Sequence, residues 1–187
     1  MVHITNYANN TDYLYLFVGA VIIDVIVIFL TKYPGPSPVF KVKALDDWYN
    51  RFGATAAAAD ILSAMIGIAA ARYIFTTSGF NPNNLAMFAL TIVLFQLFHD
   101  ALFYLAVIVP LPRGHNQMID IFKDYAEENG GKILVADALI LLGTLFFAMV
   151  LKSLPTHFTF FTGILSLYTL CFILYTSLQL RKSCGDS

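Results

Sequence analysis

Five apolar runs constrain the fold of this chain more than any other feature, because each is long enough to cross a bilayer as a helix. We expect these membrane spans at residues 13–31, 54–75, 85–109, 133–154 and 158–180. Of the 187 residues, 58% are hydrophobic and only 12% are charged, whereas soluble domains are about 25% charged. The sequence therefore predicts an all-α integral membrane protein. Its single transmembrane domain, 13–180, lies between a short N-terminal segment, 1–12, and a polar tail, 181–187.

Two shorter segments, 39–52 and 116–128, carry apolar side chains on one face at helical spacing and charged side chains on the other. This pattern is typical of amphipathic helices that lie in the membrane interface. A polar loop is the alternative for the first segment. A proline-rich connector at 34–38 precedes it and cannot be helical. The sequence thus predicts a five-helix transmembrane bundle with two interfacial helices.

The basic residues of the loops indicate the orientation. In the five-span arrangement, Arg72 and Lys152 fall on one side of the membrane. The other nine of the 11 basic residues fall on the opposite side: Lys32, Lys41, Lys43, Arg51, Arg113, Lys123, Lys132, Arg181 and Lys182. Basic loops stay in the cytosol. We therefore expect the N-terminus outside or in the lumen, and both amphipathic helices and the C-terminus in the cytosol. Cys184 of the tail would then lie in the cytosol, where it is a candidate acylation site without a specific motif around it.

Four of the spans each carry one aspartate: Asp24, Asp60, Asp100 and Asp137. The helical rise places each of them roughly 6–14 Å from the cytosolic end of its helix. Gln96 and His99 join Asp100 on one helix face, because the three residues stand at i, i+3 and i+4. Ionisable groups inside a membrane cost free energy, so we expect this polar cluster to face other helices.

Two interpretations of the intramembrane polar cluster stay open. In the first, the carboxylates clamp helices together through hydrogen bonds to side-chain and backbone groups. In the second, Asp24, Asp60, His99, Asp100 and Asp137 form a proton or cation site. We favour the first, because no span is broken by glycine or proline to supply carbonyl ligands, as transporter helices often are.

Small residues recur every four positions in the second span, at Ala59, Ser63, Gly67 and Ala71. Small side chains allow helix backbones to approach closely in a membrane. The pattern predicts that this stripe packs against a neighbouring helix.

The sequence contains no Cys-x-x-Cys, His-Glu-x-x-His, Gly-x-Ser-x-Gly or P-loop motif. His99 is the only histidine within a span, so one chain lacks the two axial ligands of a bis-histidine haem. We therefore expect no enzyme activity, no cofactor and no metal site. A net charge of −1 also excludes a basic nucleic-acid binder by composition.

The second amphipathic segment is acidic on its polar face, which carries Asp120, Asp124, Glu127 and Glu128. Such a face suits a basic protein partner better than an anionic lipid. We expect these four residues to face a partner protein.

Several segments resemble a family of small multi-pass membrane proteins found in giant DNA viruses such as chloroviruses and mimivirus-like viruses. They are WYNRFG at 48–53 leading into ADIL at 59–62, FQLFHDALFY at 95–104, and IDIFKDYA at 119–126 leading into Ala136-Asp137. The resemblance covers about residues 48–147 and carries over no catalytic residue. It implies a protein of the internal membrane of a large icosahedral virion, with a minor capsid component as one role.

The sequence as a whole favours a structural membrane protein that links the membrane to capsid or other virion proteins. The alternative is a proton- or cation-conducting carrier or channel that uses the intramembrane Asp and His residues. The expected partners are the lipid bilayer and other membrane or capsid proteins, and a homo-oligomer stays open.

Overall fold

The computed structural model describes residues 4–32 and 42–176, and these residues form helices and short connections without any strand. Five helices are long and apolar enough to cross a membrane: α1 (Asp12–Lys32), α3 (Ala54–Thr77), α4 (Leu85–Phe103) with its continuation, α6 (Lys132–Lys152) and α7 (Thr156–Leu174). Two shorter helices, α2 (Lys43–Phe52) and α5 (Gln117–Asn129), are amphipathic. The prediction of an all-α bundle with five membrane-spanning helices is confirmed.

The third span continues beyond α4 as a π-helical turn, η2 (Tyr104–Ile108). The amide of Val109 donates to the carbonyl of Tyr104 at 2.9 Å, five residues back. Pro110 has no N–H to continue the ladder, and the helix ends just before it, at Ile108. The span therefore ends close to the position that the sequence predicts.

The other helix ends differ modestly from prediction. Asp12, expected in the N-terminal segment, is the first residue of α1. Helix α7 ends at Leu174, earlier than the expected 180, and Tyr175 lies in a turn. The expected proline-rich connector at 34–38, the last residues of the fifth span, the tail and Cys184 lie outside the described residues.

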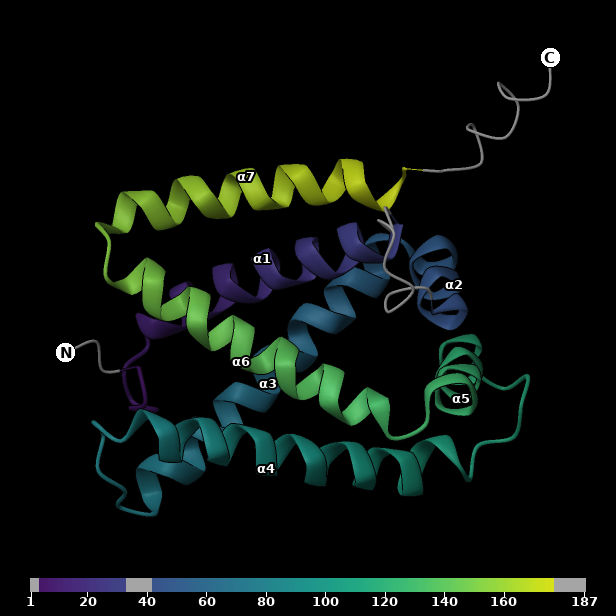
Figure 1. Cartoon of the computed structure of the whole chain (residues 1–187), viewed down its shortest axis with the longest axis horizontal. Helices are drawn as coiled ribbons and strands as arrows, with labels where there is room; N and C mark the ends of the chain where they lie inside the picture. Colours follow the sequence, from purple (N-terminus) through teal and green to yellow (C-terminus); the bar gives the residue numbers. More distant parts are fainter. Residues whose placement is uncertain (1–3, 33–41, 177–187) are drawn as a thin grey trace.

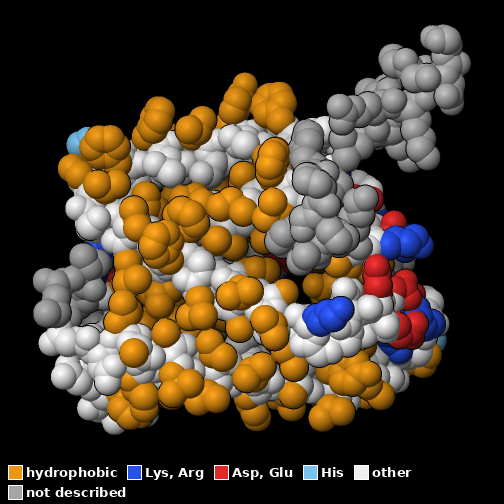
Figure 2. Space-filling view, viewed as in Figure 1, with side chains coloured by type: hydrophobic (Ala, Val, Ile, Leu, Met, Phe, Trp, Pro, Cys, Tyr) orange, Lys and Arg blue, Asp and Glu red, His pale blue; other side chains and the backbone are white. Residues whose placement is uncertain are grey.

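The long helices run between two ends of the molecule, and α2 and α5 lie beside each other at one of these ends (Figure 1). Helix α1 occupies the centre, packed against α3, α6 and α7, while α4 packs against α3 and α6. Apolar side chains cover much of the flank, and charged side chains gather at the end formed by α2 and α5 (Figure 2). This distribution is that of a membrane bundle with one polar end.

Glycines let α1 approach its two neighbours. A Cβ atom at Gly19 would lie 2.6 Å from the carbonyl oxygen of Thr144 in α6. One at Gly143 of α6 would lie 2.6 Å from Cδ1 of Ile23, and one at Gly163 of α7 would lie 3.0 Å from Cγ2 of Val18. Helices in a membrane associate largely through such close van der Waals packing. These glycines therefore set the α1–α6 and α1–α7 contacts.

The small-residue stripe predicted in α3 is only partly an interface. Gly67 and Ala71 are buried, Ala59 is half-buried, and Ser63 lies on the exposed side. Four residues exceed one helical turn, so each step advances about 40° around the helix, and a four-residue repeat cannot keep one face. The buried small residues instead include Ala57, Ala64 and Ala71, which recur every seven positions.

Candidate functional site: an intramembrane carboxylate cluster beneath a helical cap

Helices α2 and α5 form a cap over one end of the bundle. The Trp48 ring of α2 lies 5.0 Å from the Phe122 ring of α5, measured between centroids. Phe122 in turn lies 6.2 Å from Phe103 at the end of α4. We call the pair of helices the α2–α5 cap. Its inner face is aromatic and continuous with the bundle.

A carboxylate from α5 completes the N-terminus of α2. The residue that precedes this helix, Val42, provides no side-chain cap. Glu128 accepts hydrogen bonds from the backbone amides of Lys43 and Ala44, both at 2.9 Å. A negative charge at this position satisfies unpaired amides and interacts favourably with the helix dipole. Glu128 thus joins the two helices of the cap.

Asp60 of α3 fastens the cap to the bundle. Its Oδ2 atom accepts a hydrogen bond from Nε1 of Trp48 at 3.1 Å and another from the hydroxyl of Tyr49 at 3.0 Å. Both donors belong to α2, and both side chains are almost completely buried. Hydrogen bonds to a charged acceptor are the stronger kind. Asp60 therefore acts as the helix clamp of the first interpretation.

The other predicted aspartates lie around Asp60. Asp24 of α1 is 5% exposed and interacts electrostatically with Asp60 and through a hydrogen bond with Tyr49. Its Oδ2 atom has no hydrogen-bond partner among residues 4–32 and 42–176. Asp137 of α6 interacts with both Asp60 and Asp100. The structure thus brings together all four carboxylates, one from each of four helices.

Two tyrosines of the cap lie next to this cluster. Burial raises the pKa of Tyr49 well above 10.0, and the carboxylates of Asp60 and Asp24 add to the effect. Burial also raises the pKa of Tyr125 to about 12, helped by Asp137, Asp60 and Glu128. Both phenols therefore stay protonated near neutral pH and are hydrogen-bonding groups beside the carboxylates.

Gln96, His99 and Asp100 are joined, as the sequence spacing predicts, but they are not equally buried. Gln96 is buried, and its Nε2 atom donates to Oδ1 of Asp100 at 2.7 Å. Nδ1 of His99 lies 3.2 Å from the same oxygen. The His99 side chain is 42% exposed and stacks near the rings of Phe95 and Phe103. His99 is therefore at the rim of the cluster, while Gln96 faces the interior.

Sequence reasoning missed a second charged cluster at the opposite end. Oδ2 of Asp12 lies 3.2 Å from Nη2 of Arg72, and its Oδ1 lies 2.5 Å from Nζ of Lys152. Arg72 also donates to the carbonyls of Asn6 and Asn9. The available signal was that Arg72 and Lys152 were the two basic residues on the minority side. A buried carboxylate at the start of α1 joins the ends of α3 and α6 there.

The acidic residues predicted to face a partner also have partners within the chain. Arg113 contacts Asp124 at 2.6 Å and Glu127 at 2.7 Å. Asp120 accepts a hydrogen bond from the amide of Gly114 at 2.9 Å. Asp124 and Glu127 remain exposed on the outer face of the cap. Their role toward a partner protein stays a prediction.

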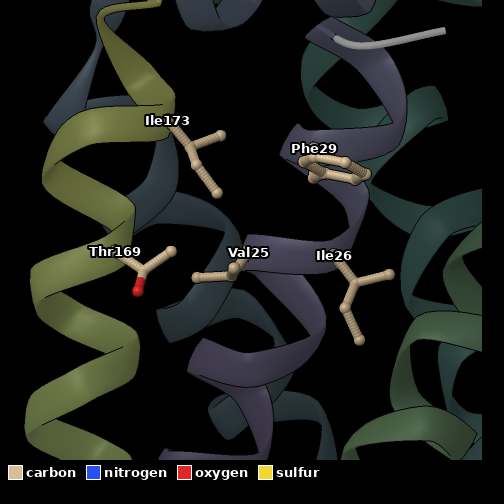
Figure 3. A pocket seen from close by; sticks show the side chains of 5 residues that line it. All are labelled: Val25, Ile26, Phe29, Thr169 and Ile173. Atoms are coloured by element: carbon tan, nitrogen blue, oxygen red, sulfur yellow. The ribbon is translucent and has the colours of Figure 1, made fainter.

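An apolar groove of about 380 Å³ lies between α1 and α7 and is open to the surface (Figure 3). Val25, Ile26 and Phe29 line it from α1, and Thr169 and Ile173 line it from α7. The Thr169 hydroxyl already donates to the carbonyl of Leu165 at 2.8 Å. The groove therefore presents a hydrocarbon surface, and its one hydroxyl group is already hydrogen-bonded to the backbone.

Within residues 4–32 and 42–176, no three His, Cys, Asp or Glu side chains are arranged to hold a metal ion. Comparisons of the chain with protein-family models, with curated proteins and with solved structures find no match. The arrangement of side chains is therefore the basis for the functional proposal.

Proposed function

We propose that this chain is a structural multi-pass membrane protein whose α2–α5 cap is a docking platform for another protein. One observation carries the proposal. The carboxylate of Asp60 accepts a hydrogen bond from each of Trp48 and Tyr49, and these two bonds hold the cap on the bundle. A buried carboxylate with two donors from a single surface helix holds that helix in one position. A platform with a fixed position can present a constant surface to a partner.

The charge distribution supports the same role. Charged side chains gather at the capped end of the molecule (Figure 2). On the outer face of the cap, the Glu127 side chain is 73% exposed and that of Asp124 is 56% exposed. Exposed charges steer partners of opposite charge and fix the register of docking. The expected partner surface is basic.

The setting that we propose is the internal membrane of a large DNA virus, where the partner is a capsid protein. Support for this setting comes from the resemblance of the segments around 48–62, 95–104 and 119–137 to giant-virus membrane proteins. The decisive experiment follows the chain through virus purification. The protein should remain with the capsid shell after host membranes are removed with mild detergent. Recovery only with cell membranes contradicts the virion role.

A charge-swap variant tests the docking platform separately. Asp124→Lys and Glu127→Lys, combined with Arg113→Glu, keep the internal ion pairs and reverse the charge of the outer face. We expect normal membrane insertion and weaker attachment to capsid proteins. Glu128 and Asp60 are left intact because they hold the cap. Unchanged incorporation into particles removes the reason to assign this face a binding role.

A proton or cation carrier is the second candidate, and it is favoured by the buried Oδ2 atoms of Asp24 and Asp100, which have no hydrogen-bond partner within the described part of the chain. The buried contacts among Asp12, Arg72 and Lys152 oppose it, because they close the other end of the bundle. Reconstitution into liposomes with a pH-sensitive dye distinguishes the two candidates. We expect no pH-driven flux. A proton leak that Asp100→Asn abolishes favours the carrier instead.

The orientation that we propose places the cap in the cytosol. The described basic residues at the capped end are Lys32, Lys43, Arg51, Arg113, Lys123 and Lys132. Arg72 and Lys152 lie at the other end, which supports this orientation by the positive-inside rule. Single cysteines at positions 123 and 153, in a background without Cys171 and Cys184, should react with an impermeant thiol reagent from opposite sides of sealed vesicles. Labelling from one side contradicts the topology.

A further inference from the structure

A crevice of about 270 Å³ lies between the π-helical turn η2 and helix α5. Tyr104, Ile108 and Val109 line it from the end of the third span, and Lys123, Ala126 and Glu127 line it from α5. The wall from the third span is therefore aliphatic and aromatic, with the phenol of Tyr104 as its one polar side-chain group, while α5 contributes an ammonium group and a carboxylate.

Both charged side chains can form further hydrogen bonds with a ligand. Nζ of Lys123 donates to the carbonyl of Leu111 at 2.5 Å, and an ammonium group has three donors in all. Oε1 of Glu127 accepts from Arg113, and a carboxylate can accept about four hydrogen bonds. Lys123 and Glu127 stand four residues apart, on one face of α5. The crevice thus presents a donor and an acceptor side by side.

Two charged residues line the crevice, and their charges balance: Lys123 is positive and Glu127 is negative. A ligand that carries both a negative and a positive group matches this arrangement better than an anion does.

The position of the crevice matches the headgroup layer of a membrane. The third span ends at Ile108, and α5 is an amphipathic helix of the interfacial kind. Further along the same span, Phe98, Leu102 and Leu105 are exposed at helical spacing. A molecule whose polar part occupies the crevice can lay hydrocarbon chains along this apolar face.

We infer that the crevice binds the headgroup of a phospholipid that carries a primary amine, a phosphatidylethanolamine. Its phosphate accepts from Nζ of Lys123, and its ammonium group donates to the carboxylate of Glu127. A choline headgroup has no N–H to donate, and a glycerol headgroup has no positive charge for Glu127. The site therefore distinguishes among lipids that share the same phosphate and acyl chains.

Native mass spectrometry of the full-length protein in detergent tests this site by titration with three lipids of identical acyl chains. We expect phosphatidylethanolamine to bind about tenfold more tightly than phosphatidylcholine or phosphatidylglycerol, the effect of one hydrogen bond between charged groups. Equal affinity for the three lipids, or tightest binding of phosphatidylglycerol, overturns the inference without any variant.

Two variants assign the roles. Glu127→Gln should remove the preference for phosphatidylethanolamine over phosphatidylcholine. Lys123→Gln should lower the affinity for all three lipids. Lys43→Gln is the matched control, since Lys43 is exposed on α2 and does not line the crevice. Emission from Trp48 in the cap reports whether each variant is folded. Retention of the full preference in a folded Glu127→Gln protein contradicts the assignment, even if Lys123→Gln fails to fold.

Discussion

Asp12 and Arg72 form an ion pair in which both side chains are completely buried, with 3.2 Å between Oδ2 and Nη2. The pair joins the first residue of α1 to the last turns of α3. Lys152 brings the end of α6 to the same carboxylate. Three helices are therefore fastened together at the end of the bundle that lies away from the cap.

Loss of one partner from this pair should be strongly destabilising. Asp12→Asn leaves the Arg72 guanidinium buried without its counter-ion, and breaking a buried pair in this way costs about 3–5 kcal/mol. The comparison is Asp47→Asn in the exposed pair with Lys43, where we expect less than about 1 kcal/mol. Denaturant unfolding in detergent measures both changes. Similar stabilities for the two variants contradict a structural role for the buried pair.

Removal of the Asp60 carboxylate should detach the cap. Asp60→Leu leaves the indole N–H of Trp48 without its acceptor, at a cost of about 1–3 kcal/mol for a buried group, and removes one of the two carboxylates with which the Tyr49 hydroxyl interacts. Trp48 is the only tryptophan in the chain, so its emission reports directly on the cap. We expect a red shift and easier proteolysis of α2.

Asp137→Leu is the matched control for that experiment, because it removes an aspartate of the same cluster that has no described hydrogen bond to α2. Its Trp48 emission should stay close to that of the unaltered protein. A red shift of equal size in both variants means that the cluster as a whole, and not the Asp60 clamp, holds the cap.

The sequence predicts the parts of this fold that follow from one helix at a time. Run length predicts the five spans, and helical spacing predicts the two amphipathic helices. The helical rise and the distribution of basic residues together predict that Asp24, Asp60, Asp100 and Asp137 lie at one end. The structure brings these four carboxylates together.

The rest of the fold depends on how each helix is rotated and on which helices pack together. A single stretch of sequence specifies neither. Ser63 is exposed because the four-residue stripe drifts around α3. Glu128 is not merely a surface charge, since it caps the N-terminus of α2, more than 80 residues away in the chain. The sequence assigns Asp12 to a polar N-terminal segment, because the residues that bury and pair with it come from α3 and α6.

Substitution of Gly19 should destabilise the protein more than substitution of any other glycine in the α1–α6 contact. A Cβ atom there would lie 2.6 Å from the backbone oxygen of Thr144, which cannot rotate away. We expect Gly19→Ala to cost about 1–3 kcal/mol by overpacking. Gly131→Ala is the control, since nothing lies within 4 Å of its Cβ position. Thermal unfolding in detergent should separate the two variants clearly, and equal melting temperatures contradict close α1–α6 packing.

Stability at alkaline pH should depend on Tyr125. Its pKa is raised from 10.0 to about 12 in the folded protein, mainly by burial and then by Asp137, Asp60 and Glu128. Below pH 10 the phenol is protonated in both the folded and unfolded states, so its full contribution is present. Above that pH the unfolded state releases the proton first, and the contribution is lost as pH rises toward about 12. The difference between the two pKa values corresponds to roughly 2.7 kcal/mol. Tyr125→Phe should therefore flatten the fall in melting temperature over this range. Identical alkaline profiles for Tyr125→Phe and the unaltered protein contradict the burial of Tyr125 beside the carboxylate cluster.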